Sequence, residues 1–332
     1  MEERDGIMSD IIVLHSAISG KIGPEESKKR IINLVETALG SEGSEKELPI
    51  AYVSNKEETE FVLTRIIEKK IPKIAISGGD GFAAVFANCF FKARAALKKE
   101  DYNPDVLFLA SGTGNAISYC AKFKTPAVAL KCLIENKYST TPLNMLEVTL
   151  KKAKELTHFV SFGADGEILE IYKNQKLKGL LGYILSVFRY AFSRKLYNPF
   201  SRNDANYNLN IKKDGRQFHS GRYEGGGVSC IEYVGYGFKP YPLAFAGNAH
   251  MRFVLFGALL MPTMFNFTRW NFLKRPNRVI YDHALTEAAV LDFSFDRELH
   301  VQISGDNVEK QSAVRVEFTK DKKLNMVKRE NS

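Results

Sequence analysis

Two glycine turns set strict limits on how the first half of this chain folds. The first turn lies at the end of the segment KIAISGGDG, residues 73–81. The second lies at the end of DVLFLASGTGN, residues 105–115. Each follows a short apolar segment of the kind found in parallel sheets that helices cover on both faces. Because the carboxyl ends of parallel strands share one edge of a sheet, we expect both turns at the edge where open α/β folds bind ligands.

Strand-like and helix-like segments alternate through the first 150 residues. Apolar runs at 11–16 and 50–54 are followed by amphipathic stretches at 26–39 and 56–70, whose apolar residues recur at helical spacing. This alternation predicts an α/β domain with a parallel sheet over residues 1–143.

The pattern changes from about residue 144. Alternating or β-branched segments separated by Gly, Asn and Asp predict an antiparallel β-rich domain over 144–318, and the glycine triplet at 225–227 is read as a turn. A single apolar helix, basic at both ends, interrupts these segments at 176–195. Residues 319–332 form a basic tail that we expect to be frayed at its tip, or to return to the first domain.

A strand that runs into a glycine turn and then a helix is a candidate anion site. Unpaired N–H groups at the helix N-terminus carry partial positive charge, and glycine allows a phosphate to approach the main chain. Neither turn has the GxGxxG or GK[ST] pattern, which disfavours hydride transfer and Walker-type binding. The alternative is that both are simply tight turns.

The composition indicates which class of protein the chain belongs to, but it does not identify the ligand. The 332 residues are 45% hydrophobic and 26% charged, which excludes a largely disordered chain, and the net charge of +9 favours an anionic partner. No recognisable nucleic-acid-binding module accompanies this charge. Four scattered cysteines indicate reduced thiols in a cytoplasmic protein, and no apolar run is long enough to span a bilayer.

Three motifs in order resemble the diacylglycerol kinase catalytic family, which includes sphingosine and ceramide kinases. SAISGK at 16–21 resembles the NPxSGxG loop, SGGDGFAAVFANC at 77–89 resembles GGDGTxxEvxNG, and ASGTGNAIS at 110–118 resembles PxGTGNxxA. The likeness continues more faintly into the stretch 159–193 and into HVQISGDNV at 300–308, which is similar to the family's vDGE segment.

The resemblance implies a two-domain lipid kinase. An α/β domain like that of phosphofructokinases and NAD kinases would hold ATP with Mg²⁺, and a C-terminal antiparallel β-sandwich would hold a diacylglycerol- or sphingoid-type lipid. The residues carried over are, for ATP, Ser19, Gly20, Gly78, Gly79, Gly81, Gly112, Thr113, Gly114 and Asn115; for catalysis, Asp80 and Asp306; for Mg²⁺, Asp80; and for the lipid, Asp165 or Glu167.

The role of Asp80 stays open at this point. Its carboxylate suits acceptance of the hydroxyl proton or orientation of Mg²⁺, and both are compatible with a cap on the helix that it opens. The family's Asp-Gly-Glu becomes Ser304-Gly305-Asp306, and Ser304 cannot act as a general base near neutral pH. A catalytically degenerate nucleotide- or lipid-binding relative is therefore the main alternative, and an NAD kinase a weaker one.

A lipid substrate would have to be drawn from a bilayer. Lysines precede the apolar helix at 176–195, and arginines lie in or just after it: Lys173, Lys176, Lys178, Arg189, Arg194 and Lys195. Cations near an anionic surface each contribute about 1 kcal/mol. We therefore expect a cytoplasmic protein that associates peripherally with the inner face of a membrane.

Overall fold

The computed structural model describes residues 10–17, 23–40, 48–112, 114–150, 154–193, 206–234, 239–244, 247–254 and 280–330. The chain divides into two compact units. The first comprises residues 1–142 and 324–332, and the second comprises 143–323. The sequence places the end of the first domain at residue 143, one residue later than the structure does. It places the end of the second domain at residue 318, five residues earlier than the structure does.

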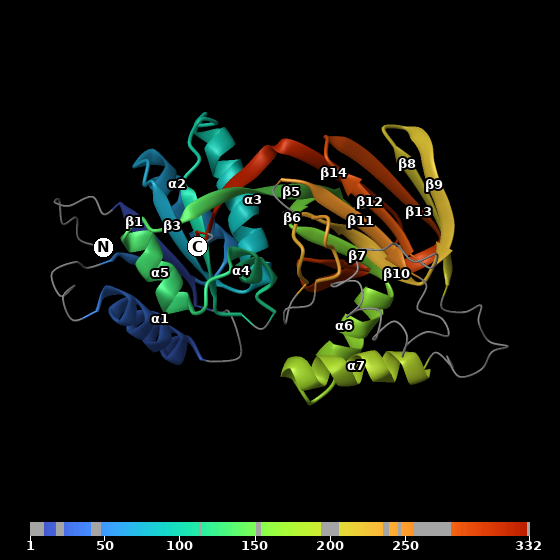
Figure 1. Cartoon of the computed structure of the whole chain (residues 1–332), viewed down its shortest axis with the longest axis horizontal. Coiled ribbons are helices and arrows are strands. Elements are labelled where there is room, and N and C mark those ends of the chain that lie inside the picture. The colour runs from blue at the N-terminus through green and yellow to red at the C-terminus, as the bar shows by residue number, and fades with distance from the viewer. Residues whose placement is uncertain are drawn as a thin grey trace. The chain divides into compact units, whose positions relative to one another are not determined.

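Unit 1 is an α/β structure built on a parallel sheet, with the strand order β4-β3-β1-β2. In Figure 1, α1 lies beside α5 and α2 beside α3. Apolar residues of the strands, such as Val13, Ala75 and Leu107, are fully buried against α1 and α5. The elements are β1 (Ile11–Ser16), α1 (Pro24–Leu39), β2 (Ile50–Val53), α2 (Lys56–Glu68), β3 (Lys73–Gly78), α3 (Asp80–Ala96), β4 (Asp105–Ala110), α4 (Ala116–Ala121) and α5 (Pro126–Ile134).

The basic tail is a strand for most of its length and returns to the first unit, which is one of the two outcomes expected for it; its last two residues, 331 and 332, lie outside the described part of the chain. β14 (Asp306–Lys328) extends through it, and Asn325 and Met326 pair in parallel with the start of β4. Leu324, Met326 and Val327 of the tail are buried, although charged residues surround them in the sequence. This high charge conceals the strand in the sequence.

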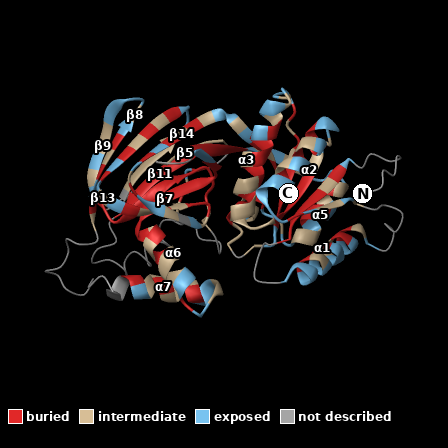
Figure 2. Ribbon diagram, turned by 180° about the vertical axis from the view of Figure 1, so that it is seen from behind, coloured by how far each residue is buried: buried red, intermediate tan, exposed pale blue. Residues whose placement is uncertain are grey.

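Unit 2 is an antiparallel β structure with two helices, α6 and α7. Its strands follow the order β12-β11-β10-β7-β13-β14; β8 is attached to β13 and β9 to β8, while β5 is attached to β14 and β6 to β5. Figure 2 shows buried residues along the strands and exposed ones on α7. The elements are β5 (Ser139–Thr149), β6 (Lys154–Thr157), β7 (Phe159–Gly163), α6 (Ala164–Asn174), α7 (Gly179–Ser193), β8 (Tyr207–Lys213), β9 (Arg216–Tyr223), β10 (Gly225–Ser229), β11 (Ala249–Val254), β12 (Ile280–Leu285) and β13 (Ala289–Ile303).

The strands of unit 2 form one curled sheet that encloses its own core. Phe162 of β7 contacts both Phe253 of β11 and Phe295 of β13. The sheet also approaches itself at its edges, because His219 of β9 stacks on Tyr281 of β12 at 3.7 Å between ring centroids. The mixed α/β class with C-terminal antiparallel strands is confirmed, but these strands are hydrogen-bonded in one branched sheet rather than in two separate sheets.

The glycine triplet is part of a strand rather than the predicted turn. Residues 225–229 form the buried strand β10, which pairs with β7 and β11. A Cβ on Gly227 would lie 2.0 Å from the Val160 carbonyl oxygen, and one on Gly226 would lie 2.2 Å from that of Arg252. Glycine is therefore required here by close approach between strands, a reason that the sequence does not display.

The stretch LTHFVSFGADGEILEIY at 156–172 is one of the segments from which the sequence predicts the antiparallel domain, but it becomes helical after Gly163. Gly163 has a φ of +72°, which ends β7 and turns the chain into α6. Ile168 of α6 then packs with Tyr190 of α7 in a small apolar cluster. Among the described residues, no helix is both long and apolar enough to cross a membrane.

Candidate active site

The two glycine turns meet at the carboxyl ends of neighbouring strands. β3 and β4 pair in parallel, with Ser77 opposite Leu109 and Gly78 opposite Ala110, so their turns begin at the same level. A Cβ on Gly112 would lie only 2.3 Å from the Cα of Gly79. The two backbones touch at this point, and a side chain at 112 would force them apart.

Asn115 closes the second turn from within. Its Oδ1 accepts a hydrogen bond from the Gly112 N–H, and its Nδ2 donates to the Gly112 carbonyl oxygen, both at 2.8 Å. Asn115 has a φ of +54°, a left-handed conformation that asparagine tolerates better than most residues. The amide that the sequence suggests for ATP binding is thus engaged in shaping the turn.

Asp80 joins the two turns, and it caps α4 instead of the helix that it opens. Its Oδ2 accepts from the N–H of Ala116 at 3.0 Å, and its Oδ1 accepts from the N–H of Ile117 at 3.2 Å. Among the roles left open for Asp80, a cap on the helix starting at residue 80 is therefore excluded. A carboxylate at the start of α4 is favourable because the first N–H groups of a helix have no partner within it.

The start of α3, in contrast, has no side-chain cap. Gly79 occupies the N-cap position without a capping hydrogen bond, and the first intrahelical bond runs from the Ala83 N–H to the Gly79 carbonyl. The N–H groups of residues 80–82 precede that bond and are directed out of the helix end. This uncapped terminus of a 17-residue helix is the better anion site of the two.

The remaining nucleotide candidates divide into two groups. Gly81 and Gly114 are half-buried parts of the two turns. Ser19, Gly20 and Thr113 lie outside the described residues, as do Arg194 and Lys195 of the basic helix. Sequence reasoning missed three buried side chains beneath the turns, His15, Ser27 and Ser77, which are joined by hydrogen bonds.

The residues near the turns fit a magnesium ion that arrives with its nucleotide. Within the described parts of the chain, no three His, Cys, Asp or Glu side chains come together as a metal site. Mg²⁺ in phosphoryl-transfer sites is commonly held by one or two carboxylates together with substrate phosphates. Asp80 can supply one such carboxylate beside the anion site.

Unit 2 contains a second polar site around Asp165 in the first turn of α6. Burial raises the pKa of this carboxyl to about 7, although part of the side chain remains accessible. The negative charge of ionised Asp165 in turn raises the pKa values of Tyr183, Tyr207 and Tyr241 beyond the effect of their own burial. Within the described residues the fully buried Tyr207 hydroxyl has no hydrogen-bond partner. Glu167, the other expected lipid-binding acid, is half-buried on the same helix.

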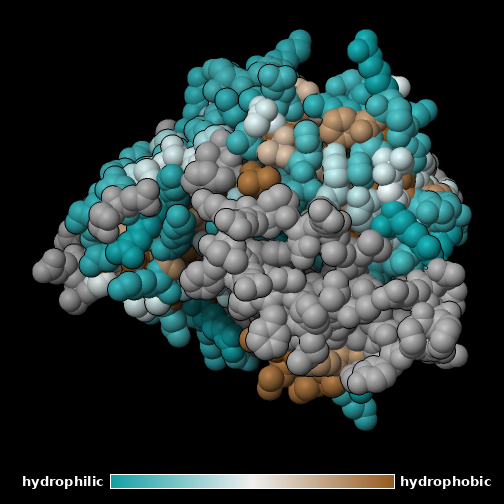
Figure 3. All heavy atoms as spheres, turned by 45° about the vertical axis from the view of Figure 1, so that its right-hand side comes forward, coloured by the Kyte–Doolittle hydropathy of each residue, from teal (hydrophilic) through white to brown (hydrophobic). Residues whose placement is uncertain are grey.

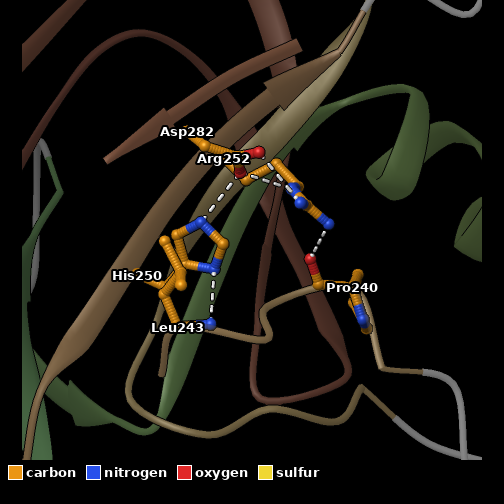
Figure 4. A network of polar contacts seen from close by, with 5 residues as sticks. All are labelled: Pro240, Leu243, His250, Arg252 and Asp282. Carbon is orange, nitrogen blue, oxygen red and sulfur yellow. Dashed lines mark hydrogen bonds and ion pairs between the residues drawn. The ribbon is translucent and has the colours of Figure 1, made fainter. Parts of the chain in front are cut away.

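A network of polar contacts anchors the segment that carries Tyr241. Arg252 donates through Nη2 to Asp282 at 2.9 Å and through Nη1 to the Pro240 carbonyl (Figure 4). His250 contacts Asp282 through Nε2 at 2.8 Å and accepts the Leu243 N–H through Nδ1 at 3.3 Å. Residues on either side of Tyr241 are therefore tied to β11 and β12.

The motif Ser304-Gly305-Asp306 forms the tight turn between β13 and β14. Ser304 and Gly305 both have positive φ, +48° and +91°, as a two-residue hairpin turn requires. The buried Ser304 hydroxyl contacts the Thr157 hydroxyl and lies 3.1 Å from Nδ1 of His158. Asp306 is exposed and pairs with Lys173 of α6 at 3.2 Å.

Comparisons with known proteins agree with this geometry. Residues 11–148 match the family model described as the diacylglycerol kinase catalytic domain. A candidate diacylglycerol kinase from Bacillus anthracis str. Sterne is 16% identical with a TM-score of 0.65, covering 95% of both chains. A second such candidate is 14% identical with a TM-score of 0.62 over 96% of both chains. A diacylglycerol kinase of the same organism is 13% identical with a TM-score of 0.59 over 95% of both.

Comparison with the curated proteins finds no match. The resemblance that the three motifs predict is confirmed over residues 11–148. The solved structures share the fold of this chain along nearly its whole length.

Proposed function

We propose that this protein is a lipid kinase that transfers the γ-phosphoryl group of ATP to the hydroxyl of a diacylglycerol- or sphingoid-type lipid. The observation that carries the proposal is the junction of the two glycine turns. Their backbones meet at Gly79 and Gly112, and Asp80 bridges them within the segment that matches the diacylglycerol kinase catalytic domain.

Phosphoryl transfer depends mainly on positioning and charge neutralisation. The N–H groups of residues 80–82 at the uncapped end of α3 would bind the phosphates, and the close contact between Gly79 and Gly112 would hold the second turn beside them. ATP with Mg²⁺ supplies the phosphoryl group when bound. Each oxygen of Asp80 accepts one backbone N–H and keeps a lone pair, which can face Mg²⁺ or receive the hydroxyl proton.

The acids of unit 2 would contribute to lipid binding and catalysis. A carboxyl whose pKa burial raises to about 7 beside tyrosine rings suits a headgroup that offers a hydroxyl or ammonium donor, which supports Asp165 as the lipid-binding acid. Asp306 is the second catalytic candidate. Its ion pair with Lys173 is solvent-exposed and therefore weak enough to exchange for another partner.

A membrane-facing surface would give access to the lipid. The surface consists of exposed leucines on and before α7, Leu177, Leu180 and Leu181, with exposed lysines beside them, Lys173 and Lys176. Figure 3 shows hydrophobic side chains at the lower edge of the molecule, where α7 lies in Figure 1. Exposed leucines next to lysines suit an anionic bilayer, with the leucines entering the interface and the lysines facing the headgroups. This supports a peripheral association with the inner face of a membrane in a cytoplasmic protein.

The function is tested by incubating the purified protein with γ-labelled ATP, Mg²⁺ and, in parallel reactions, either NAD or micelles that contain diacylglycerol, sphingosine or ceramide. We expect label in one lipid class and a loss of about 100-fold in Asp80→Asn. Asp101→Asn, on an exposed turn after α3, is the matched control and should keep full activity. Label transferred to NAD instead of any lipid would make the protein an NAD kinase and refute the proposal.

A catalytically degenerate relative is the second candidate, and Ser304 favours it. The hydroxyl that stands in place of the family's acid contacts Thr157 and His158 in a buried setting, so it offers no replacement carboxylate. ATP binding without label transfer to any lipid would support this candidate.

A further inference from the structure

A chain of hydrogen-bonded side chains, buried except for Ser111 at its end, runs beneath the two glycine turns of unit 1. His15 lies near the carboxyl end of β1, only 4% exposed, and is in register with Ser77 of β3. Its Nδ1 is 2.9 Å from the Ser77 hydroxyl, and its Nε2 is 2.8 Å from the hydroxyl of Ser27 in α1. The chain continues from Ser77 to Ser111, which opens the second turn.

The hydrogen bonds of this chain all run from donor to acceptor in the same direction, from Ser27 towards Ser111. Ser111 donates to the carbonyl of Gly78, where the first turn begins, and Ser77 donates to the Ser111 hydroxyl, both at 3.2 Å. The Ser77 oxygen therefore accepts from Nδ1–H of His15, and Nε2 accepts from Ser27. This assigns the neutral Nδ1–H tautomer to His15. Burial lowers the pKa of His15, which favours the same neutral form.

Apolar residues would fill these buried positions without any need for hydrogen bonds, and such replacements are often neutral or stabilising. The chain instead makes contacts of fixed direction across three adjacent strand ends, and its last two members hold the residues at which the turns begin. Tyr52 of β2 packs edge-on against the other side of the imidazole, so the ring has little freedom to rotate.

We infer that His15 is a positioning residue for nucleotide binding: through Ser77 and Ser111 it sets the spacing of the two phosphate-binding turns. The inference rests on the proposed binding of ATP at these turns. His15 touches neither turn directly and acts only through the two serines.

Two substitutions distinguish the contributions of the two ring nitrogens of His15. An asparagine amide occupies the place of Nδ1 and can still donate to Ser77, whereas a glutamine amide reaches the place of Nε2 and contacts only Ser27. We expect His15→Gln to raise the Kd for ATP–Mg²⁺ about tenfold, the worth of one buried hydrogen bond. His15→Asn should stay within about threefold of the wild type. Titration calorimetry of the full-length protein measures both, and thermal unfolding reports their stability.

Two further variants guard against a purely structural effect. Tyr102→Phe removes a buried hydrogen bond to the Ile71 carbonyl, at the amino end of β3 and away from the turns, and should lower the melting temperature without changing ATP affinity. Ser77→Ala cuts the chain without changing His15 and should match His15→Gln. Equal ATP affinities in the glutamine and asparagine variants would overturn the inference about His15 but not the proposed function. A wild-type protein that binds no ATP would overturn the proposed function and this inference with it.

Discussion

The wild-type protein should lose stability as the pH rises through the pKa of Asp165, and Asp165→Asn should remove this loss. The carboxyl has an ordinary pKa of 3.8, and burial raises it to about 7 in the folded state. A group with a raised folded-state pKa contributes most to stability below the unfolded value, and this contribution is lost as the pH rises through the folded value. At high pH the full penalty corresponds to about 4 kcal/mol, and about 2 kcal/mol of it develops between pH 5.5 and 8.5.

The measurement is urea unfolding of wild type and Asp165→Asn at these two pH values. All other titrating groups are common to both proteins, so the difference between their unfolding free energies isolates residue 165. We expect the variant to gain about 2 kcal/mol relative to wild type on going from pH 5.5 to 8.5. Glu167→Gln removes a carboxylate two residues away on α6 and is the matched control. A difference in unfolding free energy between Asp165→Asn and wild type that did not change with pH would contradict this expectation. The same change in Glu167→Gln would contradict it too, because burial of Asp165 would then not explain the change.

Three further predictions concern the turns, the hairpin and the exposed helix. Gly112→Ala should abolish ATP binding measured by calorimetry, because its methyl group would lie 2.3 Å from the Cα of Gly79; retained affinity would contradict the contact between the turns. Ser304→Asp should lower the unfolding free energy by about 1–3 kcal/mol without raising the kinase activity above that of the wild type, because it places a charge in a buried setting; higher activity in the label-transfer assay would show that this position still serves catalysis. Substitution of both Leu180 and Leu181 by serine should weaken sedimentation with anionic vesicles at least tenfold while leaving ATP affinity unchanged; unchanged sedimentation would exclude α7 as the membrane contact.

Local patterns in the sequence were sufficient to predict the alternating elements of unit 1 and the glycine turns. Short apolar runs and helical periodicity reflect burial at each residue, and a glycine turn between a strand and a helix needs few distant contacts to be recognised. The motif spacing also predicted the likeness to the diacylglycerol kinase catalytic domain, which the family match confirms.

Contacts between residues far apart in the chain decided the rest. Residues 225–227 read as a turn because three glycines favour flexibility, yet they form a strand since β7 and β11 approach too closely for any side chain. The partner of the Asp80 carboxylate is 36 residues away at the start of α4, which no helix-capping pattern around residue 80 could indicate.

The sequence by itself determined where the strands and helices of unit 1 and its two glycine turns occur, because these follow from periodicity and from the conformations that glycine allows. Only the tertiary structure decided what each side chain at the turns does. It directed Asp80 to α4, bound the amide of Asn115 within its own loop, and linked His15 to both turns through two serines. The physical reason is that hydrogen bonds act over about 3 Å, so their partners are set by how strands pack side by side and not by order along the chain.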